Sequence, residues 1–513
     1  MKRQLAMAAV AAAMFAALPA TASAAKFQYG VASAEASSSS IVLWTRAPAA
    51  GKVQVDIAQN RRFRKALTKS QSASASHDNT VRVKVTRLKS NSTYYYRFRQ
   101  GKSKSGTGVF ITAPKASSTK AFSFSYSGDA DAQRAQGQTN PFYNTFQAYG
   151  SMAKERNAFN INLGDTIYSD SEVPNTPPAL TVADKWAKYK QNLALPNLQK
   201  LRSTGSVFNH WDDHEFINDF TPPENGSTIY NAGVKAFTDY MPTGYKAGTG
   251  LYRTVRWGKN AQLFFLDERS FRSEKASANH VCDNPDTGQP DLAPTAPQST
   301  RNTFSLVIPS LARPVSQACL DKINDPNRSL LGKPQLTRFT AQVKASTAKW
   351  KIIVNEVPIQ QFYALPYDRW EGYAAERKTV LTTLSGLKNV VVLTTDTHAN
   401  MYNDARFQTL EQGGPKNSGV TEMVTGPVAT MTFNKEIDGT TGKPGTGGLV
   451  ASLFLKPQPP NGVGMKCYQT DSFSYTQVQV SSGKLVLRPK TLNGAALQNP
   501  DNTPCGPYTL TAK

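Results

Sequence analysis

Four short clusters of aspartate, histidine and glycine follow apolar runs that are typical of β-strands. In layered α/β proteins, ligand sites lie at the carboxyl ends of the strands, so we expect these clusters to converge. Gathered carboxylates repel one another and resist desolvation unless a cation compensates their charge. The pattern therefore predicts an α/β fold with a multivalent metal site. The clusters are Gly128-Asp129-Ala130-Asp131, Gly164-Asp165-Thr166-Ile167-Tyr168, His210-Trp211-Asp212-Asp213-His214-Glu215 and Thr395-Asp396-Thr397-His398.

Each cluster taken singly has a simpler explanation, because an aspartate after glycine is a common turn residue. The positions of the histidines favour a metal site over isolated turns. The chain has only five, and three of them, His210, His214 and His398, lie within the clusters. Four such clusters, each at or just beyond a strand end, are hard to explain as turns alone.

Residues 119–513 alternate strand-like runs with helix-like stretches, which is typical of a layered α/β domain. One helix is expected shortly after Pro334 and another over residues 374–384. The stretch 413–448 is rich in Gly, Thr and Pro, and we expect loops there. Strands are expected at 121–126, 159–163, 263–266, 352–354 and 390–393, with a closing hairpin formed by 475–480 and 484–487.

Residues 26–114 contain only strand-like runs separated by turn residues, which predicts an all-β sandwich of the fibronectin or immunoglobulin type. A small polar linker over 112–120 separates this unit from the α/β part. The expected strands include residues 41–44, 53–57, 81–85 and 93–98.

Residues 1–24 have the pattern of a signal peptide. Lys2 and Arg3 precede an apolar run over 5–18, and Ala22-Ser23-Ala24 offers a cleavage site. A membrane anchor is the alternative, but the run is shorter than the ~20 residues that span a bilayer. We therefore expect a secreted, periplasmic or cell-envelope protein with no transmembrane segment in the mature chain, exported by the Sec or twin-arginine route.

Four cysteines in an exported chain favour two disulfides. Three pairings are open, and proximity in sequence favours Cys282 with Cys319 and Cys467 with Cys505. A thiolate metal site is the alternative, but no C-x-x-C spacing is present.

The net charge of +23 favours anionic partners such as phosphate esters or an acidic cell envelope. The basic residues are scattered, which is equally typical of a soluble surface, and they form no specific nucleic-acid motif.

Longer motifs in the chain carry a family resemblance. Leu163-Gly164-Asp165 with Ile167-Tyr168, and Trp211-Asp212-Asp213-His214-Glu215, resemble motifs of the calcineurin-like metallophosphoesterases, and in detail those of the PhoD-like alkaline phosphatases. Leu266-Asp267-Glu268-Arg269 and Trp370-Glu371-Gly372-Tyr373 follow in the same order. The resemblance covers residues 27 to 485. It implies a metallophosphoesterase-like β-sandwich flanked by helices, preceded by the all-β domain.

The resemblance implies hydrolysis of phosphomonoesters or phosphodiesters by a metal-bound hydroxide, at a site with two or more metal ions. Asp165 is then the bridging ligand, and His214 faces the phosphate as a catalytic residue beside Asp213. The other implied ligands are Asp213, Asp396, His398, Tyr168 and Asn355, although Asn355 also fits as an ordinary residue after a strand.

One departure concerns the cysteine ligand that well-known members carry after the first strand. Here that position lies in Ser125-Tyr126-Ser127-Gly128-Asp129, and Asp129 stands as the substitute ligand. Asp131 replaces a histidine of the usual motif, and Asp131 and Asp212 are additional candidate ligands. Oxygen-rich ligation suits Ca²⁺, Mn²⁺ or Fe³⁺ better than thiolate-preferring ions, while Zn²⁺ stays open.

Two other functions remain as alternatives: a phospholipase D-like or nuclease-like phosphodiesterase on the same scaffold, and a non-catalytic protein that binds the cell envelope. Arg134, Lys154 and Arg269 lie near the motifs and are candidates for a phosphate clamp or for structural roles.

Overall fold

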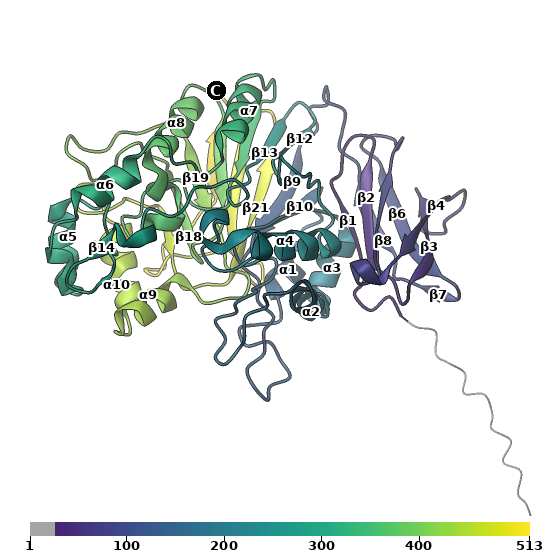
Figure 1. Cartoon of the computed structure of the whole chain (residues 1–513). Coiled ribbons are helices and arrows are strands. Elements are labelled where there is room, and N and C mark those ends of the chain that lie inside the picture. Colours follow the sequence, from purple (N-terminus) through teal and green to yellow (C-terminus); the bar gives the residue numbers. More distant parts are fainter. Residues whose placement is uncertain (1–25) are drawn as a thin grey trace, which may run out of the picture.

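The computed structural model describes residues 26–513 and is built on two large β-sheets that pack face to face (Figure 1). The expected signal peptide, residues 1–24, lies outside the described residues. Within residues 26–513, no helix combines the length and the hydropathy that a membrane span requires.

The first sheet has nine strands with a parallel centre. In order across the sheet they are β23 (Tyr508–Thr511), β22 (Lys484–Thr491), β21 (Ser474–Val480), β9 (Phe122–Ser127), β10 (Phe159–Leu163), β11 (Ser206–His210), β1 (Val31–Ala34), β2 (Ile41–Arg46) and β5 (Thr80–Val85). Strands β9, β10 and β11 run parallel, so their carboxyl ends lie on one edge.

The second sheet has seven strands. In order they are β12 (Arg253–Trp257), β13 (Ala261–Phe265), β16 (Trp350–Val354), β17 (Val390–Thr394), β19 (Thr421–Val424), β18 (Asn400–Asp404) and β20 (Cys467–Gln469). Strands β13, β16, β17 and β19 are parallel. The expected strands of the α/β part are therefore confirmed, with ends shifted by a few residues.

Strand β10 shows how alternation builds the layers. Phe159, Ile161 and Leu163 enter the apolar core between the sheets, together with residues of β13, β16 and β17. Asn160 and Asn162 alternate with them and are buried in hydrogen bonds instead; Asn162 accepts one from Tyr149 at 2.8 Å. Burying apolar area on this scale is the main stabilising contribution to the fold.

Helices cover the outer faces of the two sheets. The expected helices near Pro334 and over 374–384 are confirmed as α7 (Lys333–Lys344) and α8 (Ala374–Ser385), which share an apolar cluster with the seven-stranded sheet. The nine-stranded sheet is covered by α1 (Gln147–Met152), α2 (Val182–Leu193), α3 (Pro196–Thr204) and α4 (Pro222–Tyr240).

Residues 31–111 contain the strands expected there, and these form part of two sheets. Strands β4 (Leu67–Ala73), β3 (Gly51–Ala58), β6 (Thr93–Gln100) and β7 (Ser103–Lys104) pair in that order, and β8 (Gly108–Ile111) pairs with β6. Strands β1, β2 and β5 instead extend the nine-stranded sheet, because Ser33 of β1 pairs with Ser206 of β11. The N-terminal strands thus share a sheet and an apolar core with the α/β part.

The expected disulfide pairing is confirmed. Cys282 is bonded to Cys319, and Cys467 to Cys505. The first bond closes an insertion between β13 and β16 that holds α5 (Gln298–Phe304) and α6 (Gln317–Asn324).

The expectation of loops over 413–448 is wrong in part. This stretch contains β19 and two helices, α9 (Phe433–Thr441) and α10 (Thr446–Val450). Both helices are short, and their local sequence favours them weakly. Tertiary contacts hold α9 in place, since the backbone amides of Phe433 and Asn434 donate to the carbonyls of His398 and Thr470 at 3.1 Å.

Candidate metal centre

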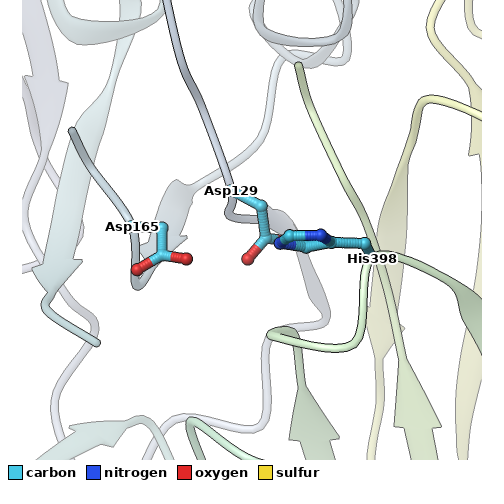
Figure 2. A group of neighbouring side chains, drawn as sticks. All are labelled: Asp129, Asp165 and His398. Carbon is cyan, nitrogen blue, oxygen red and sulfur yellow. The ribbon is translucent and has the colours of Figure 1, made fainter. Parts of the chain in front are cut away.

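The loops after β9, β10 and β17 meet at one edge of the two sheets. Figure 2 shows Asp129, Asp165 and His398 pointing toward a common space from three separate segments. One ligand atom of each lies within 4.8 Å of the others, and all three residues are buried. The expected convergence of three of the four clusters is therefore observed.

The backbone at this edge adopts a conformation that most residues avoid. Asp129, Asp165, Asp396 and His398 all have positive φ angles, of 62°, 47°, 68° and 52°. Left-handed backbone at non-glycine residues is uncommon and is concentrated at functional sites.

The third cluster extends the site. Asp165, Asp213 and His214 form a second group of three ligand atoms within 4.8 Å, and Asp165 is common to both groups. A third group adds Asp219 and Asp368 to Asp213. Asp165 is thus shared by two of the three groups, and its role as a bridging metal ligand stays a prediction.

Glu215, the last residue of the Trp-Asp-Asp-His-Glu motif, joins two loops of the site. Its carboxylate accepts hydrogen bonds from the backbone N–H and hydroxyl of Thr166, both at 2.6 Å, and from the N–H of Asp212 at 2.8 Å. It therefore ties the loop after β10 to the loop after β11. This fixes the position of Asp165 relative to Asp213.

The acidic groups differ in how their charge is compensated. Arg269 has a fully buried side chain; its Nε lies 2.5 Å from Asp212 and its Nη2 2.8 Å from Asp368. Arg272 and Lys275 add further cations to Asp368 and Asp219. Arg269 is thus a structural counter-charge, and its guanidinium is committed to these carboxylates rather than free to clamp phosphate.

Asp129 and Asp165 have no such partner: among the described residues, neither forms an ion pair with Lys or Arg within 4.0 Å. Asp129 accepts a hydrogen bond from the N–H of Asp396 through Oδ1 at 3.3 Å, while its buried Oδ2 has no partner. Burial raises the pKa of Asp129 to about 7 and that of Asp165 well above its usual value. Uncompensated carboxylates with a free acceptor oxygen beside an imidazole fit a bound metal cation.

Both histidines of the site have a carboxylate partner. His214 Nδ1 lies 2.7 Å from Asp170, and the backbone N–H of His214 donates to Asp165 at 3.2 Å. Burial alone would lower the pKa of His214, but Asp213, Asp165 and Asp170 together raise it well above its usual value. This arrangement holds a cationic or proton-donating imidazole against the site.

Tyr168 lies between the two histidines. Its ring stacks on that of His214 at 4.1 Å between centroids, and its hydroxyl lies 2.8 Å from Nε2 of His398. His398 Nδ1 contacts Glu436 of α9. Burial would lower the pKa of His398, but Glu436 and Asp129 raise it to about 10.

The other residues expected at the site occupy different positions. Asn355 donates from Nδ2 to the carbonyl of Val357 at 2.5 Å and accepts from Trp370 at 3.1 Å. Asp396 lies near the guanidinium of Arg269, at 3.8 Å. Asp131 accepts from the hydroxyl of Ser171, in the loop after β10, and from the N–H of Gln133 in its own loop. Within residues 26–513, Asp396, Asp131 and Asp212 belong to none of the groups of converging ligand atoms, and the role of every expected residue as a metal ligand, Asn355 included, stays a prediction.

Four acidic residues near the site were not predicted from the sequence: Asp170, Asp219, Asp368 and Glu436. Asp170 follows Tyr168 by two residues, and Asp368 precedes the Trp370 motif by two, so proximity to the motifs was the available signal. Glu436 carried no such signal, because it lies in the stretch expected to be loops.

The two layered sheets form a mixed α/β fold that is similar to the folds of known phosphatases. A solved structure of PhoD is similar over 96% of this chain and 90% of its own length, with a TM-score of 0.71 and 23% identity. A purple acid phosphatase from yellow lupin (Lupinus luteus) seeds is similar over 94% of this chain and 74% of its own, with a TM-score of 0.55 and 10% identity. These likenesses concern the fold.

Two family profiles match the sequence. The PhoD-like phosphatase profile matches residues 133–484, more than half of the chain, and the profile of the PhoD-like phosphatase N-terminal domain matches residues 10–114. The chain belongs to the PhoD-like phosphatase family. It is also 28% identical to alkaline phosphatase D of Bacillus subtilis (strain 168) over 290 residues, which span 50% of this chain and 43% of that relative.

Proposed function

We propose that the mature chain is an exported, metal-dependent phosphoesterase that hydrolyses phosphomonoesters, phosphodiesters or both. The observation that carries this proposal is the buried pair Asp129 and Asp165, which lies beside His398 without any Lys or Arg partner among the described residues. Such a pair is costly unless a multivalent cation occupies the space between its members. Membership of the PhoD-like phosphatase family supports the same reaction class.

Asp129, Asp165 and His398 would hold one ion, and Asp165 with Asp213 a neighbouring one. Tyr168, Asp396 and Asn355 are further candidate ligands, and the oxygen-rich donor set favours Ca²⁺, Mn²⁺ or Fe³⁺. Bound ions of this kind supply an acidified water as nucleophile and positive charge for the phosphoryl oxygens.

His214 is proposed to donate a proton to the leaving oxygen. Asp170 engages its Nδ1, which leaves Nε2 as the nitrogen available to substrate. Asp170 itself is held by the N–H of Asn218 at 2.8 Å. The pair therefore keeps the imidazole in one orientation while the proton moves from Nε2 to the ester oxygen.

His214→Ala is expected to lower kcat for phenyl phosphate by about 10²- to 10³-fold, and for p-nitrophenyl phosphate by only about tenfold. The difference arises because a poor leaving group needs protonation and a good one does not. His280→Ala is the matched control, since that side chain is 89% exposed. Equal losses with both esters would mean that His214 does not act as the acid.

The reaction class is tested with p-nitrophenyl phosphate and bis-p-nitrophenyl phosphate on the purified mature chain. Turnover of the first, the second or both assigns monoesterase, diesterase or dual activity. A phospholipase D-like or nuclease-like enzyme would turn over only the diester. Folded protein that turns over neither would leave the envelope-binding alternative.

Export is proposed from the signal-like residues 1–24, and the two disulfides support an oxidising destination such as the periplasm or the outside of the cell. We further propose that residues 26–114 form a fibronectin-like sandwich domain, whose strands β1, β2 and β5 continue the nine-stranded sheet, and that residues 119–513 form the catalytic domain. The high positive charge would favour association with an anionic cell envelope.

A further inference from the structure

We infer that Glu436, on helix α9, is a positioning residue that orients His398 toward the metal centre. The inference rests on the proposed function, because it concerns how a residue outside the four motifs serves that site. Its basis is a direct contact: Oε1 of Glu436 meets Nδ1 of His398, while the other ring nitrogen of His398 faces Tyr168 at 2.8 Å.

The two nitrogens of His398 therefore have separate tasks. Nε2 lies on the side of Tyr168, and a ligand atom of His398 is within 4.8 Å of Asp129 and Asp165. Nδ1 lies on the opposite side of the ring, against Glu436. Donating Nδ1–H to a carboxylate fixes the tautomer of a ligating imidazole and makes its free nitrogen a better ligand.

Helix α9 is hydrogen-bonded at its start to the backbone of His398. The N–H of Phe433, its first residue, donates to the backbone carbonyl of His398 at 3.1 Å. At the N-cap, Thr432 uses its hydroxyl for Asp471 at 2.6 Å and makes no cap bond within the helix. The start of the helix is thus bonded to His398 and to Asp471, which follows β20. Strand β20 in turn pairs with β18, the strand that follows His398.

The electrostatics of the helix favour a carboxylate at this position. The N-terminus of a helix carries a partial positive charge, which disfavours a basic imidazole placed against it. Glu436 lies in the first turn of α9 and compensates that charge. Its side chain is 33% exposed, while that of His398 is 7% exposed, so the contact closes the outer side of the histidine.

Asp438 offers a matched control on the same helix. Its carboxylate accepts hydrogen bonds from the N–H groups of Gly445 and Gly447, both at 2.9 Å, and so serves the turn between α9 and α10. Replacing it removes one negative charge from α9, as replacing Glu436 does, but leaves the contact with His398 intact. Any difference between the two variants therefore reports on that contact.

The experiment is dialysis of the mature protein, as purified, against increasing EDTA, with retained metal measured by elemental analysis and folding by thermal unfolding. Glu436→Ala is expected to lose its metal at about 10- to 100-fold lower EDTA than the wild type. Glu436→Gln, which keeps an acceptor oxygen, should fall between them, and Asp438→Asn should match the wild type. If Glu436→Ala fails to fold, metal retention by Glu436→Gln tests the inference in its place.

The inference is overturned if Glu436→Ala, or the Gln variant in its place, retains metal as the wild type does, or if Asp438→Asn loses metal equally. Wild-type protein that holds no metal would overturn it as well. If the Glu436 variants retain metal as the wild type does, and Asp165→Asn still abolishes turnover, only this inference is removed. Unchanged turnover in Asp165→Asn would instead remove the proposed function.

Discussion

Replacing Asp165 with asparagine is expected to lower turnover of p-nitrophenyl phosphate by at least about 10³-fold, or roughly 4 kcal/mol of transition-state stabilisation. Asp165 contributes to two of the three ligand groups at the site, so one substitution disturbs both. Asparagine has the same size and keeps an oxygen, but it lacks the charge that binds a cation. The measurement is kcat at saturating ester and metal.

Asp321→Asn provides the control for that variant, because Asp321 is an exposed residue of α6 on the insertion. It should leave kcat unchanged. An Asp165→Asn protein that folds and turns over ester at the wild-type rate would contradict the assignment of this residue as a metal ligand.

Removing the metal is expected to make the stability of the protein fall as the pH rises. In the metal-free protein, burial raises the pKa of Asp129 from 3.8 to about 7. Between these values the unfolded chain binds fewer protons at this group than the folded chain, so the free energy of unfolding decreases with increasing pH. At about 1.4 kcal/mol per pKa unit, Asp129 alone accounts for a loss on the order of 4 kcal/mol over the whole interval, of which about 3 kcal/mol falls above pH 5.

Urea unfolding at pH 5 and pH 8, with and without EDTA, measures this effect. The EDTA-treated protein should be clearly less stable at pH 8 than at pH 5, and added metal should restore stability mainly at pH 8. Asp129→Asn should reduce this pH dependence without abolishing it, because the pKa values of Asp165, His214 and His398 are raised in the folded chain as well. A chelated protein whose stability does not fall over this interval would show that the carboxylates are compensated in another way.

The parallel strands and the ligands that follow them could be predicted because both depend on local sequence. Strand β10 alternates Phe, Ile and Leu with two asparagines, and Gly164-Asp165 comes directly after it. The strand ends of β9 and β17 carry similar signals. Since β9 and β10 are neighbouring parallel strands of one sheet, Asp129 and Asp165 were expected to approach one another. His398 follows β17 of the other sheet, so its approach depends also on how the two sheets pack.

The remaining features depend on contacts between distant segments. Glu436 reaches His398 across 38 residues, and Asp368 reaches Arg269 across 99. The pairing of Ser33 with Ser206, which joins the N-terminal strands to the nine-stranded sheet, has no local signature. Helix α9 was missed for the same reason, because its anchors are the carbonyls of His398 and Thr470.

The central claim is that ester hydrolysis depends on metal held at the edge formed by Asp129, Asp165 and His398. The most direct test is turnover of p-nitrophenyl phosphate and its diester by the purified mature chain before chelation, after chelation and after metal is restored. We predict that chelation abolishes turnover and that added metal restores it in the wild type but not in Asp165→Asn. Turnover that persists in folded protein from which elemental analysis finds the metal removed would contradict the claim.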